Sequence, residues 1–514
     1  MRGVSFLAVV ACLGPGLIAS AIASPAAPVL SQWQSYGHDT SGSRTNAVER
    51  LLPASRVRKG LKVAWKFDTH SPVYGTPVVS DGRVYAASVF GQVYALNSAT
   101  GALIWAGDVG PVATFPAVAT SSPLVVDGLV IVGDQNGRVW ALDAATGLVK
   151  WTSQPNLNRG FPAIWGSPVA ANVRIAGAKK SVILVPVASN EETTTPTTQQ
   201  PCCYAVGSVA ALDPADGSVL WQVFTINDQD RQRGAAGASV WTTPIYDPAL
   251  NMVFFTTGNN FSNKDAGPAS KTSDAFFGVD ASTGRIVWTN QRTPGDTYTG
   301  ALQRNGTTHP DYDFGDSPEL FRLPNGRAVL VAGQKSGFMY VVDARTGQTL
   351  SQKQLVPGGE LGGFFSDSAY ANGMIYANGN DWPAYGGGEL GGFEAMVLGP
   401  IIGNPPPKSG NVLGVGVDPA GQLQQRWKFS IPGTAVMSAV ATAQGVVYVD
   451  ATQQGSLYAL DAKTGMKLTS FTLGPSVSGP SIAEGKIFMG YGDFFGFGGT
   501  NPFVGGVVAL VPAG

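Results

Sequence analysis

The chain has 514 residues, of which 33 are Lys or Arg and 34 are Asp or Glu, so its formal net charge is −1. Charged residues make up only 13% of the chain, about half the share typical of a soluble domain. This balance excludes a basic nucleic-acid-binding surface and an acidic tail as the main functional feature. Hydrophobic residues make up 44%, which is enough for a large core and excludes wholesale disorder. The 67 glycines and 35 prolines favour many short strands joined by turns over long helices.

The start of the chain has the features of a secretory signal peptide. Arg2 supplies a positive charge, Val4–Leu13 form an apolar run, and Ala21-Ile22-Ala23 is a small-x-small cleavage site. Gly14-Pro15-Gly16 interrupts the run, and no other stretch approaches the length of about 20 apolar residues that a transmembrane helix needs. The alternative is processing as a lipoprotein with lipid attached to Cys12. We expect an exported protein without a membrane span, secreted or, in a bacterium, periplasmic.

The mature chain keeps two cysteines, and these are adjacent in sequence, at Cys202 and Cys203. An oxidising compartment disfavours a free thiol pair. Consecutive Cα atoms lie about 3.8 Å apart, below the usual disulfide span, so a bond between neighbours is strained. We expect a vicinal disulfide. The alternative is two incidental thiols, one of which pairs between chains.

One pattern recurs along the chain: a glycine, apolar alternation, Leu-Asp, a turn that ends in Gly, and a strand that closes on Trp. Complete copies start near Gly91, Gly137, Gly207 and Asp274 and close on Trp105, Trp151, Trp221 and Trp288. Two further copies, from Gly337 and Gly455, lack the tryptophan, and the copy from Gly410 to Trp427 is degenerate. An eighth copy starts at Gly505 and stops at Gly514, before any closing strand.

The strand that the eighth copy lacks is expected near the other end of the chain. Val63–Phe67 has the pattern of the tryptophan strand, but no copy of the repeat precedes it. The copies recur at intervals of about 59 residues, a length that suits four short strands and a loop, the unit of a propeller blade. Pairing of Val63–Phe67 with Val507–Leu510 would complete the last unit and close a ring.

The predicted fold is therefore all-β, an eight-bladed β-propeller of four-stranded antiparallel blades closed by an N-terminal strand. We assign residues 1–23 to the signal peptide, 24–60 to an N-terminal extension and 61–514 to the propeller. The hairpin Thr76–Tyr85 is expected to turn at Asp81-Gly82. The repeated Trp and the turn Gly are expected to interlock neighbouring blades. The long intervals 137–207 and 337–410 are expected to add loops on one mouth of the ring.

Six motifs between Pro201 and Gly337 make the chain similar to the PQQ-dependent quinoprotein dehydrogenases. They are Pro201-Cys202-Cys203, Ala238-Ser239-Val240-Trp241, Thr257-Gly258-Asn259, Thr293-Pro294-Gly295-Asp296, Asp313-Phe314-Gly315 and Ala332-Gly333-Gln334-Lys335-Ser336-Gly337. The chain most resembles polyvinyl-alcohol-dehydrogenase-like propellers that bind pyrroloquinoline quinone (PQQ), and the resemblance runs from Trp33 to the C-terminus. The haem-attachment pattern Cys-x-x-Cys-His is absent, so we expect no haem domain and a separate electron acceptor.

The resemblance implies positions that bind the quinone. Trp241 matches the tryptophan whose face supports the planar quinone, and the Cys202–Cys203 disulfide resembles the lid on the other face. Lys335 matches a basic residue near the quinone carbonyl oxygens, where its charge would stabilise negative charge that develops there.

The resemblance also implies a calcium site beside the quinone. Asn259 and Glu192 (or Glu191) match calcium ligands, and Asp313 matches the aspartate that both approaches the calcium and takes the alcohol proton. Oxygen ligands of these types suit a hard dication. Such an ion would polarise the quinone carbonyl while a carboxylate accepts the hydroxyl proton.

The implied function is an exported quinoprotein oxidoreductase that oxidises a small or polymeric alcohol to a carbonyl with PQQ and calcium. One alternative is a quinone-free propeller that acts as a binding or assembly scaffold. Val206 favours this alternative, because it stands where family members often carry an arginine suited to a quinone carboxylate. The other alternative is a cofactor-free enzyme that uses acids such as Asp313 and Glu192 for proton transfer in the same pocket.

Overall fold

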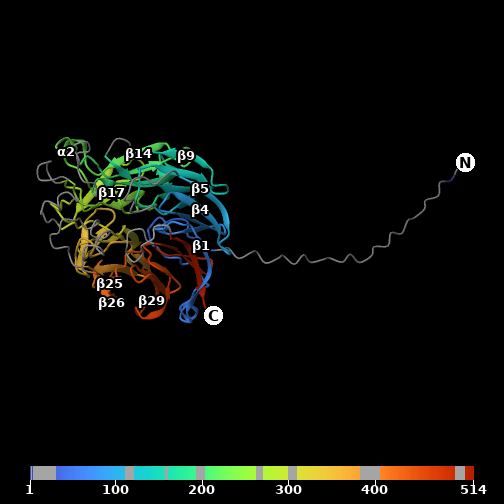
Figure 1. Ribbon diagram of the computed structural model, residues 1–514. Coiled ribbons are helices and arrows are strands. Elements are labelled where there is room, and N and C mark those ends of the chain that lie inside the picture. The colour runs from blue at the N-terminus through green and yellow to red at the C-terminus, as the bar shows by residue number, and fades with distance from the viewer. Residues whose placement is uncertain are drawn as a thin grey trace.

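The computed structural model describes residues 1, 3, 31–109, 121–156, 160–192 (without the side chain of Glu192), 203–261, 270–298, 310–382, 406–492 and 504–514. The described strands form eight antiparallel sheets around one axis, with the chain passing round the ring from blue to red (Figure 1). The eight-bladed propeller is confirmed. Helix in the described residues is confined to α1 (Ala54–Val57), α2 (Asp228–Gln232) and the single 3-10 turn η1 (Asn190–Glu192).

The strands of a blade follow chain order from the axis outward, except in blade 3, which has an extra strand, and in the last blade, whose outermost strand comes from the N-terminal end of the propeller sequence. Blade 1 comprises β2 (Val78–Ser80), β3 (Arg83–Ala87), β4 (Gln92–Asn97) and β5 (Leu103–Asp108), and blade 2 comprises β6 (Leu124–Val126), β7 (Leu129–Gly133), β8 (Val139–Asp143) and β9 (Val149–Ser153). Blade 3 comprises β10 (Pro162–Ala163), β11 (Val169–Ile175), β12 (Ala178–Ser189), β13 (Ser208–Leu212) and β14 (Val219–Phe224). Blade 4 comprises β15 (Ile245–Asp247), β16 (Met252–Thr256), β17 (Ala275–Asp280) and β18 (Ile286–Gln291). First strands of neighbouring blades contact one another. They are mostly buried, whereas outer strands such as β5 and β18 are largely exposed.

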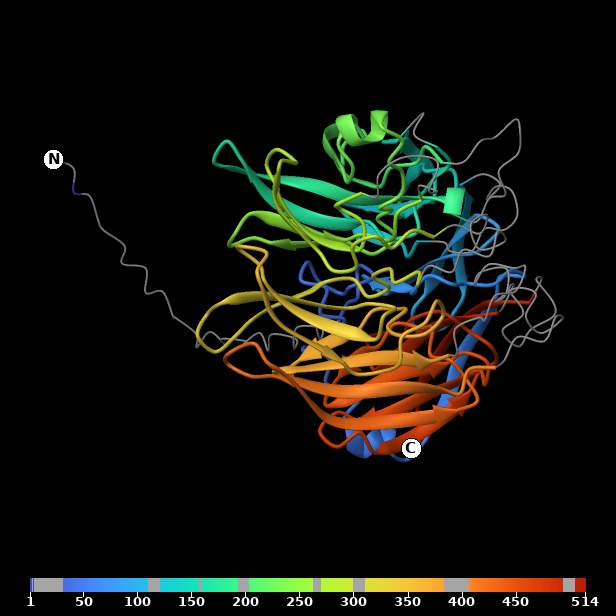
Figure 2. The same ribbon diagram turned by 90° about the vertical axis from the view of Figure 1, so that its left-hand side faces the viewer.

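The second half of the ring repeats this plan. Blade 5 comprises β19 (Glu319–Arg322), β20 (Ala328–Gly333), β21 (Phe338–Asp343) and β22 (Thr349–Gln354), and blade 6 comprises β23 (Ala369–Ala371), β24 (Met374–Asp381), β25 (Ser409–Val417) and β26 (Leu423–Pro432). Blade 7 comprises β27 (Ala441–Ala443), β28 (Val446–Ala451), β29 (Ser456–Asp461) and β30 (Lys467–Thr472). Blade 8 comprises β31 (Ser481–Ala483), β32 (Lys486–Tyr491), β33 (Gly506–Pro512) and β1 (Leu61–Asp68). Figure 2 shows the sheets from the side, layered against one another.

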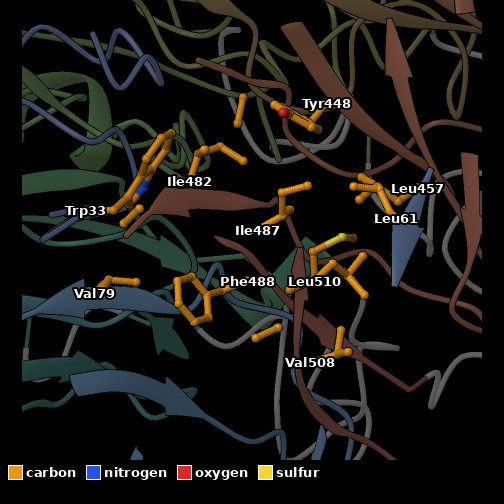
Figure 3. Close-up of a cluster of buried hydrophobic side chains, with 14 of the residues drawn as sticks. Trp33, Leu61, Val79, Tyr448, Leu457, Ile482, Ile487, Phe488, Val508 and Leu510 are labelled. Atoms are coloured by element: carbon orange, nitrogen blue, oxygen red, sulfur yellow. The ribbon is translucent and has the colours of Figure 1, made fainter. Parts of the chain in front are cut away.

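An N-terminal strand closes the ring, as predicted. β1 pairs antiparallel with β33, with Val63 opposite Leu510 and Phe67 opposite Val507. Because the last blade contains both ends of the propeller sequence, it can separate from the ring only if this pairing breaks. Beside it lies a large apolar cluster, in which Phe488 and Leu510 pack with residues of blades 1 and 7 (Figure 3).

Blade 3 departs from the predicted four-stranded pattern. Its sheet has five strands, because β12 is 12 residues long and extends beyond its pairing with β11. The end of β12, at Ala188 and Ser189, pairs with β10 instead. Parts of the two long intervals, residues 193–202 and 383–405, lie outside the described residues, so the location of those loops on one mouth stays a prediction.

The repeated tryptophan joins a blade to the next at six of the eight junctions. The Trp105 Nε1–H group of blade 1 donates to the carbonyl of Ala144 in blade 2 at 3.1 Å. A Cβ atom on Gly147, in the same turn of blade 2, would lie 2.6 Å from the Trp105 ring. Gly147 also has a φ of +75°, so this turn needs glycine for its conformation and for space. The same contact of ring on glycine occurs in the pairs Trp65–Gly101, Trp151–Gly217, Trp221–Gly284, Trp288–Gly347 and Trp427–Gly465.

A second set of bonds between blades runs around the axis. Just before the first strand of several blades, a backbone N–H group donates to a hydroxyl or carboxylate oxygen at the matching position of the next blade. The donor–acceptor pairs are Thr76–Ser122, Ser122–Ser167, Ser167–Thr243, Thr243–Ser317 and Ser317–Asp367, at 2.8–3.1 Å. These bonds satisfy backbone donors that the packed centre would otherwise leave unpaired.

The N-terminal extension is part of the ring. Residues 31–50, which we call the strap, pair with first strands of six blades. The backbone-bonded pairs are Trp33–Val79, Gln34–Val125, Thr40–Tyr246, Ser41–Leu320, Ser43–Tyr370 and Arg44–Thr442. Arg44 is fully buried, and its guanidinium donates to the carbonyls of Tyr36, Val440 and Pro480. The strap therefore holds together blades that are far apart in sequence.

Candidate functional site

Four of the residues singled out in the sequence meet at one end of the ring. Trp241 lies just before β15 and Asn259 just after β16 in blade 4, while Asp313 lies before β19 and Lys335 after β20 in blade 5. In an antiparallel pair, the start of the first strand and the end of the second lie at the same edge. The blade topology therefore brings these loops together, although the residues span nearly a hundred positions.

Asp313 is at the centre of the site. Its carboxylate accepts the backbone N–H of Asn259 through Oδ1, and its Oδ2 lies 2.9 Å from Lys335 Nζ. Lys335 Nζ also bonds both carboxylate oxygens of Asp311, at 3.1 and 3.2 Å. All three charged side chains are at least nine-tenths buried. The ammonium group of Lys335 thus lies between the carboxylates of Asp311 and Asp313, and burial strengthens the attraction between these opposite charges.

More carboxyl groups surround this pair. Asp296 is buried and accepts the backbone N–H groups of Asp311 and Tyr312. Burial, together with the nearby charge of Asp313, raises the pKa of Asp296 to about 6. Asp274 is fully buried, and neither of its carboxyl oxygens has a hydrogen-bond partner. Burial and the surrounding aspartates raise its pKa well above its ordinary value, because both disfavour the charged form.

Two aromatic rings form an apolar wall beside the charges. The rings of Trp241 and Phe365 are 5.9 Å apart between centroids and tilted by 55°. Lys335 Nζ lies 5.6 Å from the first centroid and 5.5 Å from the second. Gly258 separates Trp241 from Asp313: a Cβ atom there would lie 3.0 Å from Trp241 Nε1 and 2.9 Å from Asp313 Oδ1. Glycine therefore keeps open the space between the ring and the carboxylate.

The donor set fits a hard cation. Asn259 is buried, its Nδ2 donates to the carbonyl of Tyr298 at 2.9 Å, and its Oδ1 has no hydrogen-bond partner. An amide oxygen that is buried without a donor costs free energy unless a cation or water meets it. The backbone N–H of the same residue contacts Asp313, so an amide oxygen and a carboxylate lie in one neighbourhood. Among the described His, Cys, Asp and Glu side chains, no three converge as a metal-binding group.

The structure describes only one of the two candidate glutamates. Glu191 is buried, and its Oε2 accepts the backbone N–H groups of Tyr204 and Ala205 at 2.7 and 2.6 Å. Burial raises its pKa. Ala205 in turn accepts a backbone bond from Gly237, which connects Glu191 to the loop before Trp241. The side chain of Glu192 lies outside the described residues, so its assignment as a ligand stays a prediction.

The cysteine pair is also described only in part. Cys203 is partly buried and packs against Ala205, Ala236 and Phe261, whereas Cys202 lies outside the described residues. The vicinal disulfide stays a prediction. Val206 is buried in an apolar cluster with Ile226 and Ala238, which is a poor environment for a charged side chain.

Sequence reasoning missed several residues of the site. Asp311 was not among the candidate residues, yet it shares Lys335 with Asp313. Asp296 was noted only within a motif, and Phe365 was not singled out. The signal for Phe365 is weak, because it comes from the next blade, where a Gly-Gly-Phe-Phe segment gives no periodic pattern.

Two parts of the chain match known protein families. Residues 58–202 match the family described as outer membrane protein assembly factor BamB. Residues 184–363 match the family described as the β-propeller domain of glucose/ethanol/alcohol dehydrogenase. The second match contains Trp241, Asn259, Asp313 and Lys335.

Two relatives of the chain are polyvinylalcohol dehydrogenases. The enzyme from Pseudomonas sp. is 28% identical over 492 residues, which cover 89% of this chain and 72% of the relative. The enzyme from Sphingopyxis sp. (strain 113P3) is 28% identical over 371 residues, covering 68% of this chain and 55% of the relative. The chain therefore spans about half to three quarters of the length of these relatives.

A solved structure shows the same fold. A europium-containing methanol dehydrogenase superposes with a TM-score of 0.70 over 94% of this chain and 98% of that one, at 18% sequence identity. Among the residues that the structure describes, no helix is both long and apolar enough to cross a bilayer.

Proposed function

Because the chain is a PQQ-repeat β-propeller related to the quinoprotein alcohol dehydrogenases, we propose that it oxidises an alcohol to a carbonyl compound with PQQ and Ca²⁺. The observation that carries this proposal is the placement of Asp313. Its buried carboxylate contacts the cation of Lys335 and the backbone of Asn259, and only Gly258 separates it from the Trp241 ring. A proton acceptor, a fixed positive charge and a flat aromatic surface thus lie together.

In this proposal the calcium ligands are the Asn259 amide oxygen, the Asp313 carboxylate and a glutamate, Glu192 or Glu191. The unpartnered Oδ1 of Asn259 supports the first. The buried carboxylate of Glu191 supports the choice of that glutamate, although its Oε2 is already bonded to two backbone donors. When bound, PQQ takes up the electrons of the alcohol and Ca²⁺ polarises the quinone as a Lewis acid.

The quinone-binding surface that we propose is the Trp241 ring, with a Cys202–Cys203 disulfide facing it. A planar cofactor suits a flat aromatic face. The Trp241 side chain is not fully buried, in contrast to the fully buried Trp33, which agrees with a ring that keeps one face accessible. Lys335, 5.6 Å from the centroid of that ring, can donate to an oxygen of a group bound against it.

In this proposal Asp313 accepts the hydroxyl proton of the substrate, and Lys335 stabilises negative charge that develops beside it. A positioned general base of this kind contributes about 10²–10⁴-fold to a rate. The buried pair with Asp311 and Lys335 fixes the carboxylate before substrate arrives, so little reorganisation is needed during the reaction. The wall formed by Trp241 and Phe365 restricts the access of water to this carboxylate.

We also propose that the protein is exported and passes its electrons to a separate acceptor. Support for export comes from the signal-like residues 1–23, and support for a separate acceptor comes from the absence of Cys-x-x-Cys-His. Two relatives are named polyvinylalcohol dehydrogenase. For this chain we likewise propose an alcohol substrate, small or polymeric.

The test is dye-linked alcohol oxidation by the purified protein loaded with PQQ and Ca²⁺, over a panel of primary, secondary and polymeric alcohols. Asp313→Asn keeps the shape of the side chain and is expected to lower kcat by about 10²–10⁴-fold. Asp461→Asn, in an exposed turn of blade 7, serves as the control and should match the wild type. Equal activity of the wild type and Asp313→Asn would overturn the assignment of the base.

A scaffold without a quinone is the second candidate. It is favoured by the family match of residues 58–202 and by the apolar surroundings of Val206, which offer no guanidinium for a quinone carboxylate. This function needs none of the buried charges around Lys335. A wild-type protein that retains no PQQ would support it.

A further inference from the structure

The segment Asp296–Tyr298 bonds the loops that carry Asp313 and Asn259, and through Glu360 it bonds a segment that packs on the Lys335 loop. We propose that Asp296 and Tyr298 are positioning residues, which set the geometry of the site without touching substrate. The inference rests on the proposed function and extends it to residues outside the cofactor and metal assignments. We call this segment the clip.

The first contact of the clip fixes the loop that carries Asp313. Asp296 Oδ1 accepts the backbone N–H of Asp311 at 3.2 Å, and Oδ2 accepts that of Tyr312 at 2.5 Å. Asp311 has a φ of +50°, a conformation that residues other than glycine rarely adopt. The carboxylate of Asp296 therefore stabilises a backbone shape that would be unfavourable in a free loop. That shape brings the side chains of Asp311 and Asp313 to the same ammonium group.

The second contact orients the amide of Asn259. The Tyr298 carbonyl accepts Asn259 Nδ2 at 2.9 Å, and the Tyr298 N–H donates to the carbonyl of Asn260 at 3.0 Å. Asn260 also forms a parallel bridge with Thr297. Because the amide nitrogen is engaged by Tyr298, the amide oxygen is the atom left without a partner. The clip thus determines which end of the Asn259 amide a cation could meet.

The third contact reaches the loop of Lys335. The Tyr298 hydroxyl donates to Glu360 Oε1 at 2.5 Å, and the neighbouring Gly359 N–H donates to the carbonyl of Lys335 at 3.0 Å. A Cβ atom on Gly363 would overlap the Lys335 carbonyl, so this segment lies directly on the Lys335 backbone. It continues into Phe365, which faces Trp241.

Removal of a buried polar group that supports a binding site usually weakens binding by about 10–100-fold. The clip supports two loops directly and a third through Glu360, and its bonds run between separate loops. An ordinary Asp turn looks different. Asp461, for example, accepts the N–H groups of Lys463 and Thr464 within its own turn.

The first arm of the test needs no cofactor. Hydrogen exchange followed by mass spectrometry would be compared for the wild type, Asp296→Ala, Asp296→Asn and the control Asp461→Ala. We expect exchange at the amides of residues 311–313 to rise at least tenfold in Asp296→Ala, with a smaller rise in Asp296→Asn, which keeps one acceptor oxygen. Unchanged exchange in Asp296→Ala, or an equal rise in the control, would overturn the inference.

The second arm measures binding of Ca²⁺ and PQQ by titration, with turnover as a further readout. Tyr298→Phe removes only the hydroxyl bond to Glu360 and keeps the carbonyl that holds Asn259. We expect this variant to keep its affinity for Ca²⁺ and lower kcat more than it raises KM, whereas Asp296→Ala weakens Ca²⁺ binding about 10–100-fold. A Tyr298→Phe protein with wild-type kcat and KM would contradict the Tyr298 assignment.

The two arms separate the clip from the proposed function. A wild-type protein that binds neither ligand overturns the proposed function and the catalytic purpose of the clip, even where exchange confirms its contacts. A wild-type protein that binds both, beside an Asp296→Ala protein that binds them equally well, overturns the clip alone. Melting temperatures within a few degrees of the wild type show that the variants are folded.

Discussion

The ammonium group of Lys335 and the carboxylate of Asp313 lie 2.9 Å apart, and both side chains are almost completely buried. The same ammonium bonds Asp311, so one lysine compensates two buried carboxylates. A buried charge that loses its partner is far more costly than an exposed one. The stability of the protein and the geometry of the proposed active site therefore depend on the same side chain.

Lys335→Met is expected to lower the free energy of unfolding by about 3–5 kcal/mol, because it leaves two carboxylates buried without a cation. Lys408→Met is the matched control, since Lys408 Nζ lies 4.0 Å from Asp381 Oδ1 and the Lys408 side chain is exposed. Exposed pairs contribute about 0–1 kcal/mol. Urea unfolding of both variants measures the difference. If both variants lost the same free energy of unfolding, the result would contradict the importance of the buried pair of Lys335 and Asp313.

Gly147→Ala is expected to destabilise the ring by about 1–3 kcal/mol more than Gly128→Ala, because the added methyl group meets the Trp105 ring. Both glycines have nearly the same φ, +75° and +76°, but a Cβ atom on Gly128 meets nothing within 4 Å. The two variants therefore share the conformational cost, and the difference reports the contact with tryptophan. Thermal unfolding of the two variants is the measurement. Equal midpoints would show that the Trp105 indole and the Gly147 turn do not interlock tightly.

Arg44→Met is expected to reduce the free energy of unfolding by about 3 kcal/mol or more. The change leaves buried carbonyls of Tyr36, Val440 and Pro480 without their donor, and each lost partner costs about 1–3 kcal/mol. Arg58→Met, at the exposed residue that follows α1, should fall within about 0.5 kcal/mol of the wild type. Chemical denaturation measures both. A wild-type midpoint for Arg44→Met would mean that the strap does not brace the ring.

Asp450→Asn is expected to raise stability at neutral and alkaline pH. Asp450 is fully buried, its carboxyl oxygens have no partners, and burial raises its pKa well above the ordinary value of 3.8. Above pH 3.8 the folded protein therefore holds a proton that the unfolded chain has lost, so this group makes stability fall as the pH rises toward its folded pKa. Each unit of this shift corresponds to about 1.4 kcal/mol.

The measurement is the melting temperature of the wild type and Asp450→Asn between pH 5 and pH 9. We expect the advantage of the variant to widen with pH and to level off above the folded pKa. A constant difference across this range would show that the Asp450 carboxyl does not change its proton affinity on folding.

The blades could be predicted because their signals are local. Each Trp and each turn Gly belongs to a short repeated unit, and the contact between Trp105 and Gly147 arises once the units are stacked. Closure could also be predicted, since Val63–Phe67 has a strand pattern without a unit of its own and pairs with the end of the chain. The fifth strand of blade 3 could not, because nothing in a regular apolar run tells that β12 extends beyond its partner.

The site could be predicted in its parts but not in its connections. Trp241, Asn259, Asp313 and Lys335 were all singled out, and the structure brings them to one end of the ring. The bond between Asp311 and Lys335 joins two loops of blade 5. Phe365 faces Trp241, and Asp296 holds the Asp311 loop, through contacts between blades. The strap shows the same limit, because its bonds to six blades follow from no periodicity in residues 31–50.

The most direct test of the central claim is PQQ binding by the purified protein, measured with Ca²⁺ and with a chelator. We predict that the wild type retains PQQ through gel filtration in Ca²⁺ and loses it in the chelator, and that Asn259→Ala weakens binding about tenfold or more. Asn411→Ala is the control, since Asn411 is equally buried and its amide donates to the carbonyl of Gly379, but its Oδ1 is already bonded to Ser430. No retained PQQ at micromolar concentration, or retention that neither the chelator nor Asn259→Ala changes, would contradict the account.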